Sequence, residues 1–196
     1  MQIVAVTKGF GAEAIDACVA AGCADVGENY AQEAVAKWTS FASPPARLHF
    51  IGRLQTNKVR MLAPHVALWQ SVDRAALVDA ISRSAPGARV LVQVNVSDEP
   101  TKGGCVPDVA ASIVDRARAA GLAVEGLMTV GRTGEPGDAA AGFAVLRRLV
   151  DRLGLSVCSM GMSDDLEIAV AEGATMVRVG SALLGMRPSH PPAELA

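Results

Sequence analysis

The sequence predicts a single α/β domain folded as a (β/α)8 TIM-type barrel. Eight short apolar segments alternate with segments of helical periodicity along nearly the whole chain of 196 residues. The apolar segments start roughly 19 to 34 residues apart, which is the length of a strand–helix unit. Eight such units favour a closed barrel. The alternative, an open doubly wound sheet, is weakened because no glycine-rich dinucleotide fingerprint follows the first segment.

The predicted strands are short runs of branched and apolar residues that end in polar or glycine-containing loops. They are expected at 2–8, 24–29, 48–52, 67–73, 89–96, 123–130, 156–160 and 175–179. The segment RVLVQVNV at 89–96 is the clearest of them. The first segment, QIVAVTK, is too short for an ordinary helix and has the composition of a buried strand.

The predicted helices lie between these strands. They are expected at 11–21, 30–38, 56–62, 74–84, 107–120, 138–153 and 164–172. Gly22, Gly121 and Gly173 follow three of them at similar helix-to-strand joints, where glycine commonly ends a helix. The eighth helix is expected to be missing or very short, so that residues 1–186 form the barrel domain and 187–196 an irregular tail.

The composition excludes several classes of function. The net charge is −2, which does not indicate a nucleic-acid or membrane-surface partner. No apolar stretch of about 18 residues suggests a membrane helix, and the first residues lack the basic region of a signal peptide. The cysteines and the three histidines are too scattered for a zinc site or a disulfide framework. We therefore expect a cytoplasmic protein without a metal site.

In a barrel of this kind the residues that follow the strands surround one mouth, where ligands bind. Lys8 follows the first strand, although a lysine there could also simply reach water. Ser163 opens the loop-to-helix turn after the seventh strand, as a phosphate contact or as a plain helix N-cap. Gly180 and Ser181 follow the eighth strand, and the loops after strands seven and eight commonly hold phosphate.

Arg178 on the eighth strand points into the barrel if Val177 and Val179 point outward. A lysine, a phosphate site and an inward cation together suit pyridoxal 5′-phosphate (PLP). The lysine forms an imine with it, and a protein group faces the ring nitrogen. A permanent cation in that last position opposes protonation of the ring nitrogen, which disfavours transaminase-type chemistry.

The sequence resembles the pyridoxal phosphate homeostasis protein family, the YggS/PROSC-like PLP-binding proteins. Nine segments in chain order carry this resemblance. They are VAVTK (4–8), GENYAQE (27–33), HFIGRLQTNK (49–58), SVD (71–73), VNV (94–96), KGG (102–104), GLMT (126–129), SMGMSDD (159–165) and VRVGSA (177–182).

The resemblance implies a barrel like the N-terminal domain of alanine racemase, with Lys8 as the imine lysine. It also implies phosphate contacts and a ring-nitrogen partner. The residues it assigns to PLP are Lys8, Asn29, Asn57, Met162, Ser163, Arg178, Gly180 and Ser181. Family members usually begin with a helix before the first strand. The sequence shows none, so apolar surface is expected near strands one and eight.

The implied function is that of a PLP carrier or buffer in vitamin B6 and amino-acid homeostasis, without known turnover of its own. Its partners would be PLP and apo PLP-dependent enzymes, and the expected state is a monomer or weak homodimer. The alternative is a PLP-dependent amino-acid racemase. A racemase needs a second acid/base group opposite the lysine, and Tyr30 is the only phenol in the chain. A phosphate-binding barrel without PLP is a third possibility.

Overall fold

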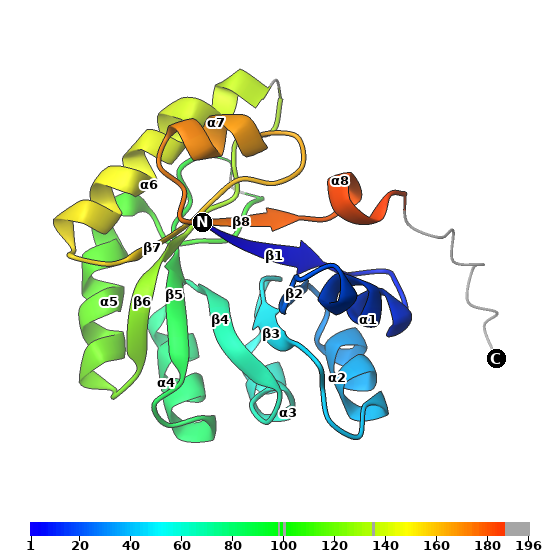
Figure 1. Cartoon of the computed structure of the whole chain (residues 1–196). Coiled ribbons are helices and arrows are strands. Elements are labelled where there is room, and N and C mark those ends of the chain that lie inside the picture. The colour runs from blue at the N-terminus through cyan, green and yellow to red at the C-terminus, as the bar shows by residue number, and fades with distance from the viewer. Residues whose placement is uncertain (98, 100, 135, 187–196) are drawn as a thin grey trace.

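The chain folds into a closed barrel of eight parallel strands that pair in the order β1 to β8, with β8 returning to β1. The computed structural model describes residues 1–97, 99, 101–134 and 136–186, so the predicted tail at 187–196 lies outside the described residues. Helices surround the strands on the outside (Figure 1). The predicted fold class is confirmed.

Each predicted strand is present. The strands are β1 (Gln2–Val6), β2 (Asp25–Glu28), β3 (Arg47–Phe50), β4 (Val66–Val72), β5 (Arg89–Gln93), β6 (Ala123–Met128), β7 (Val157–Ser159) and β8 (Met176–Val179). Several end earlier than expected. In particular β1 ends at Val6, so Lys8 lies just beyond the strand at the carboxyl mouth.

The α-helices are α1 (Glu13–Ala20), α2 (Ala31–Ser40), α3 (Val59–Leu62), α4 (Ala75–Ser84), α5 (Ala110–Ala119), α6 (Ala140–Arg152), α7 (Leu166–Ala171) and α8 (Ser181–Leu184). Short 3-10 turns are η1 (Thr56–Lys58), η2 (Pro107–Val109) and η3 (Pro136–Ala139). The helix α8 has four residues, which confirms the expected very short eighth helix. No described helix is both long and apolar enough to cross a membrane.

The three similar helix-to-strand joints share one hydrogen-bonded ending. At the end of α1, Gly22 has φ +86° and its N–H donates to Val19 O, while the Cys23 N–H donates to Cys18 O. This is a Schellman ending, in which a residue in the left-handed region satisfies the last carbonyls of a helix. The same pair of bonds recurs at Gly121 and Gly173. The likeness seen in the sequence is therefore a shared way of turning from helix into strand.

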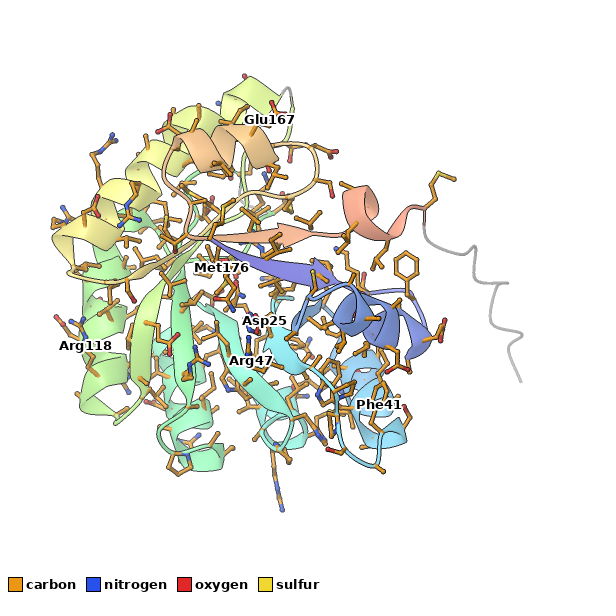
Figure 2. The ribbon with its side chains drawn as sticks, viewed as in Figure 1. Asp25, Phe41, Arg47, Arg118, Glu167 and Met176 are labelled. Carbon is orange, nitrogen blue, oxygen red and sulfur yellow. The ribbon has the colours of Figure 1, made fainter. Side chains whose placement is uncertain are left out.

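Alternation along the strands divides the apolar core into two layers. Side chains that face the barrel interior form a small cluster of Val4, Leu68, Leu91, Met128 and Met176. Side chains that face outward pack against the helices in a larger cluster that includes the fully buried Trp69 and Phe143. Figure 2 shows Asp25, Arg47 and Met176 toward the middle of the barrel and Arg118 and Glu167 on outer helices.

The surface near β1 and β8 carries exposed apolar side chains, as the sequence predicts. Ile3 on β1 is 45% exposed, and Leu183 on α8 is 43% exposed. Their neighbours along the barrel, Val4 and Val177, are buried. The exposed apolar side chains therefore lie on the outer surface of the barrel, away from its interior.

Candidate functional site

A cavity of about 230 Å³ opens at the carboxyl mouth between the ends of β1, β7 and β8. Its wall brings together seven of the eight residues that the sequence assigns to the site. These are Lys8, Asn29, Met162, Ser163, Arg178, Gly180 and Ser181. Val6, Ile51 and Val130 supply apolar wall, and Asp164 supplies the carboxylate among the lining residues. The arrangement combines two cationic side chains, two hydroxyls and an amide with a partly apolar wall.

Strand alternation positions Lys8. Val4 and Val6 face the barrel interior. Alternation along the chain therefore turns Thr7 outward and directs Lys8 into the cavity. Lys8 is half-buried. Its backbone is held from outside the barrel, because the Gly9 N–H donates to Glu33 Oε1 at 2.6 Å.

A buried ionic cluster lies behind Lys8, between the strands and α2. The Lys37 ammonium donates to Thr7 O at 2.8 Å, to Glu28 Oε1 at 2.7 Å and to Glu33 Oε1 at 2.6 Å. The Thr7 hydroxyl donates to Glu28 Oε1 at 2.6 Å. Lys37 is 7% exposed and Glu28 is fully buried. We call these four residues (Thr7, Glu28, Glu33, Lys37) the lysine clamp, because they hold the corner of the chain that carries Lys8.

Burial dominates the electrostatics of the lysine clamp. It raises the pKa of Glu28 above its usual value, although the hydrogen bonds from Lys37 and Thr7 oppose this rise. The second carboxylate oxygen, Glu28 Oε2, is buried without a hydrogen-bond partner among the described residues. The Glu28 carboxylate therefore faces α2 rather than the cavity.

The loop after β7 and the start of α8 form the opposite wall. Ser163 Oγ accepts a hydrogen bond from the Ala182 N–H at 3.2 Å, which ties the two loops together. The interpretation of Ser163 as a plain N-cap is wrong, because α7 begins at Leu166 and Asp165 precedes it. Asp165 Oδ1 instead accepts from the Met162 N–H at 2.5 Å and shapes the turn. Ser163 keeps a hydroxyl proton that it can donate to an anion in the cavity.

Arg178 supplies a buried positive charge to the cavity floor. It is 3% exposed, and its guanidinium donates to Thr129 O at 2.6 Å and to Ser159 Oγ at 2.8 Å. Burial lowers the pKa of Arg178 to about 10, which still leaves the group protonated at neutral pH. Because β8 pairs with β1, Arg178 lies at the level of Val4, one layer below the cavity mouth.

Two predicted residues lie apart from this cavity. Asn57 is exposed on η1 and is not among the residues that line the cavity, so its role remains a prediction. Tyr30 is 62% exposed at the start of α2 and lines a neighbouring cavity together with Asn29 and Lys58. Asn29 lines both cavities, and its Oδ1 is buried without a partner among the described residues.

Sequence reasoning missed Lys37, Ser159 and Thr129 as residues that support the site. Lys37 could have been found, because it lies on the buried face of α2 with Ala34 and Trp38, and it follows Glu33 by one helical turn. Ser159 and Thr129 lie in segments that carry the family resemblance, but their contacts with Arg178 could not be predicted, because they depend on the register between β6, β7 and β8.

Comparisons with known proteins agree with this geometry. A family model described as the N-terminal domain of alanine racemase matches residues 1–188. The pyridoxal phosphate homeostasis protein of Pseudomonas aeruginosa is 42% identical, over 97% of this chain and 86% of its own length.

Solved structures give the same fold. PipY of Synechococcus elongatus, solved with PLP bound, is 33% identical and superposes with a TM-score of 0.83 over 94% of this chain and 92% of that one. An alanine racemase from Clostridium difficile has a TM-score of 0.79 at 14% identity, over 99% of this chain and 53% of the racemase. The second likeness concerns the fold alone.

Proposed function

The chain belongs to the pyridoxal phosphate homeostasis protein family, and we propose that it binds PLP at the carboxyl mouth through an imine of Lys8. The observation that carries the proposal is that Lys8, Arg178 and the two hydroxyls of Ser163 and Ser181 line one cavity. PLP supplies an aldehyde that condenses with an amine and a pyridine ring that withdraws electrons. The protein supplies the amine, the anion contacts and the charge near the ring.

The residues present fit this group. Asn29 lines the cavity, and its Oδ1 is a buried acceptor that lacks a partner among the described residues. A ligand hydroxyl or N–H that reached this oxygen would satisfy it. Ser163 and Ser181 offer hydroxyl donors to a phosphate, and Gly180 between β8 and α8 leaves space beside them. The cavity is lined by two cationic side chains, Lys8 and Arg178, and by one exposed carboxylate, Asp164. This excess of positive charge favours an anionic ligand.

Arg178 would face the ring nitrogen, as the family resemblance implies. It stays protonated at neutral pH and can only donate hydrogen bonds. A fixed positive charge there opposes protonation of the ring, so it weakens the withdrawal of electrons on which transamination depends. This supports a role in holding and buffering PLP, with release to apo-enzymes as its physiological purpose.

The racemase alternative requires a second acid/base group on the far side of the ligand from Lys8. The described residues that line the cavity include no tyrosine, histidine or cysteine. Tyr30 lines the neighbouring cavity and is largely exposed. The positions of these residues favour the carrier, and turnover of an L-amino-acid panel by the PLP-loaded protein would contradict it if Tyr30→Phe abolished that turnover.

The test of the proposal is chemical. The purified protein is mixed with PLP, its imine absorbance is recorded, and the bond is reduced with borohydride before peptide mapping. We expect the label on Lys8 and loss of the absorbance band in Lys8→Ala. Lys58→Ala is the matched control, because Lys58 lines the neighbouring cavity. A label on another lysine would refute the assignment of Lys8, and no label at all would favour a phosphate-binding barrel without PLP.

A further inference from the structure

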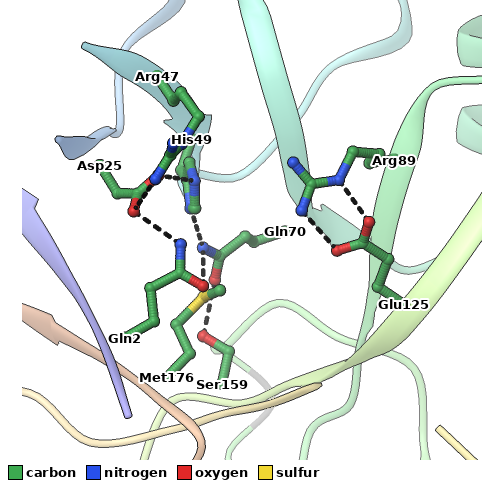
Figure 3. Close-up of polar contacts among 9 residues, drawn as sticks. All are labelled: Gln2, Asp25, Arg47, His49, Gln70, Arg89, Glu125, Ser159 and Met176. Atoms are coloured by element: carbon green, nitrogen blue, oxygen red, sulfur yellow. Dashed lines mark hydrogen bonds and ion pairs between the residues drawn. The ribbon is translucent and has the colours of Figure 1, made fainter. Parts of the chain in front are cut away.

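A continuous chain of hydrogen bonds crosses the inside of the barrel from Arg178 to the opposite mouth. Arg178 donates to Ser159 Oγ at 2.8 Å, and the Ser159 hydroxyl donates to Gln70 Oε1 at 2.7 Å. Gln70 Nε2 lies 2.9 Å from His49 Nδ1, and His49 Nε2 lies 3.2 Å from Asp25 Oδ1. Figure 3 shows the part from Ser159 to Asp25. We call these five residues the axial relay.

The axial relay takes one residue from each of five strands. Arg178 lies on β8, Ser159 on β7, Gln70 on β4, His49 on β3 and Asp25 on β2. All are buried, with Gln70 and Ser159 fully so. A polar chain inside an apolar barrel is costly unless every member is hydrogen-bonded, and here each member has its partners.

The chemistry of the two ends fixes the direction of every hydrogen bond. A guanidinium can only donate and an ionised carboxylate can only accept. Ser159 must therefore accept from Arg178 and pass its own proton to the Gln70 carbonyl. The Gln70 amide must then donate to His49 Nδ1, which leaves the proton of a neutral His49 on Nε2, directed at Asp25. Only one orientation of the Gln70 amide and one tautomer of His49 satisfy the chain.

The charged surroundings agree with this assignment. Asp25 accepts from Arg47 at 2.6 and 2.7 Å and from Gln2 at 2.7 Å, so it stays ionised. These contacts outweigh burial, which alone would raise the pKa of Asp25, and hold it below its usual value. Besides Asp25 and Arg47, Arg89 acts electrostatically on His49, and Asp165 acts on Arg178. Among the described residues no carboxylate forms an ion pair with Arg178, so its orientation depends on Ser159 and the Thr129 carbonyl.

We propose that Gln70 is a positioning residue for Arg178. By accepting the Ser159 proton it turns a lone pair of Ser159 toward the guanidinium, and that fixes the cation toward the cavity floor. Its part in cofactor tuning rests on the proposed function, since the guanidinium would face the PLP ring nitrogen. Loss of the Gln70 amide frees the Ser159 hydroxyl to rotate, loosens Arg178 and makes the ring nitrogen easier to protonate.

Gln70→Met tests this, because methionine keeps the length and volume of the side chain and removes both amide groups. Leu68→Met is the matched control: it places methionine at the preceding inward position of the same strand, outside the axial relay. Ser159→Ala breaks the same bond from the other side, and Ser159→Thr restores the hydroxyl. These two keep the test decisive if Gln70→Met fails to fold.

The first measurement uses the protein without PLP. In the ¹⁵N spectrum we expect hindered guanidinium rotation for Arg178 and the Nε2–H tautomer for His49. The Arg178 signature should be lost in Gln70→Met and kept in Leu68→Met, whereas the His49 tautomer should persist in both, because ionised Asp25 still accepts the Nε2–H. The second measurement uses the PLP-loaded protein, where the pH midpoint of the imine absorbance should shift by about one pH unit in Gln70→Met and Ser159→Ala but not in Leu68→Met or Ser159→Thr.

An unchanged Arg178 signal in Gln70→Met would overturn the positioning role whether or not PLP binds. Changed signals with an unchanged pH midpoint would overturn the link to the cofactor. Failure of the wild-type protein to take up PLP would instead refute the proposed function, and the spectra without PLP would still decide the positioning role.

Discussion

The Lys37 ammonium donates a hydrogen bond to the carbonyl oxygen of Thr7, 2.8 Å away, directly before Lys8 in the chain. A side chain from α2 thus fixes the backbone at the end of β1 from outside the barrel. The ammonium also contacts Glu28 and Glu33, so the lysine clamp holds a cation between two carboxylates. Lys8 faces the cavity on one side of the strand end, and the lysine clamp that supports it lies on the other side.

Lys37→Met should destabilise the protein by about 3 kcal/mol, because removal of one partner leaves a buried carboxylate without its counter-charge. Urea unfolding of the protein without PLP measures the loss. Lys58→Met is the control, because Lys58 is half-buried and lies outside the lysine clamp. Glu28→Gln in the Lys37→Met background should recover part of the stability, since it removes the unpaired charge. A double variant that is no more stable than the single one would contradict this account of the lysine clamp.

Stability should fall as the pH drops from 7 to 4, partly because of His49. Burial lowers the pKa of His49 from 6.5 to about 4, so the unfolded chain takes up a proton in this range before the native protein does. Over these 2.5 pH units the contribution is about 3 kcal/mol. Urea midpoints at several pH values should show a shallower dependence for His49→Asn, whereas parallel curves for the two proteins would refute a neutral buried His49.

Loss of hydroxyls on the wall opposite Lys8 should weaken PLP binding through its phosphate. Each of Ser163→Ala and Ser181→Ala should reduce affinity for PLP about tenfold, the usual effect of losing a hydrogen bond to a charged group. Affinity for pyridoxal, which lacks the phosphate, should stay nearly the same. Ser112→Ala on the outer helix α5 is the control. Equal losses for PLP and pyridoxal would place the phosphate elsewhere.

Gly22→Ala should destabilise the protein by about 1 kcal/mol through the backbone alone. Gly22 has φ +86°, and an added Cβ would meet no atom within 4 Å, so the cost comes from the left-handed conformation. Gly137→Ala is a matched control, because its Cβ would also meet open space and its φ lies outside the left-handed range. Thermal unfolding compares the two, and an equal effect would exclude the conformational explanation.

Sequence reasoning succeeded where a single strand or loop carries the information. The position of Lys8 and the inward direction of Arg178 follow from alternation and strand ends, and both residues line one cavity. It failed at one helix boundary and where two distant segments must be aligned. Ser163 looked like a helix cap because the start of α7 could not be fixed to within two residues. Gln70 and Ser159 lie 89 residues apart, and only the closed barrel brings them together.

Because β1 pairs with β8, the barrel can close only after its last strand has been synthesised. Lys8 lies beyond the first strand of the barrel, whereas Ser163, Arg178 and Ser181 lie on or beside the last two. A nascent chain that has exposed Lys8 therefore carries an amine without the opposite wall of its cavity until β8 has left the ribosome and closed the ring. Under the proposed function, retention of PLP therefore depends on closure of the ring, and a ribosome-bound chain stalled before β8 would be unable to retain the ligand.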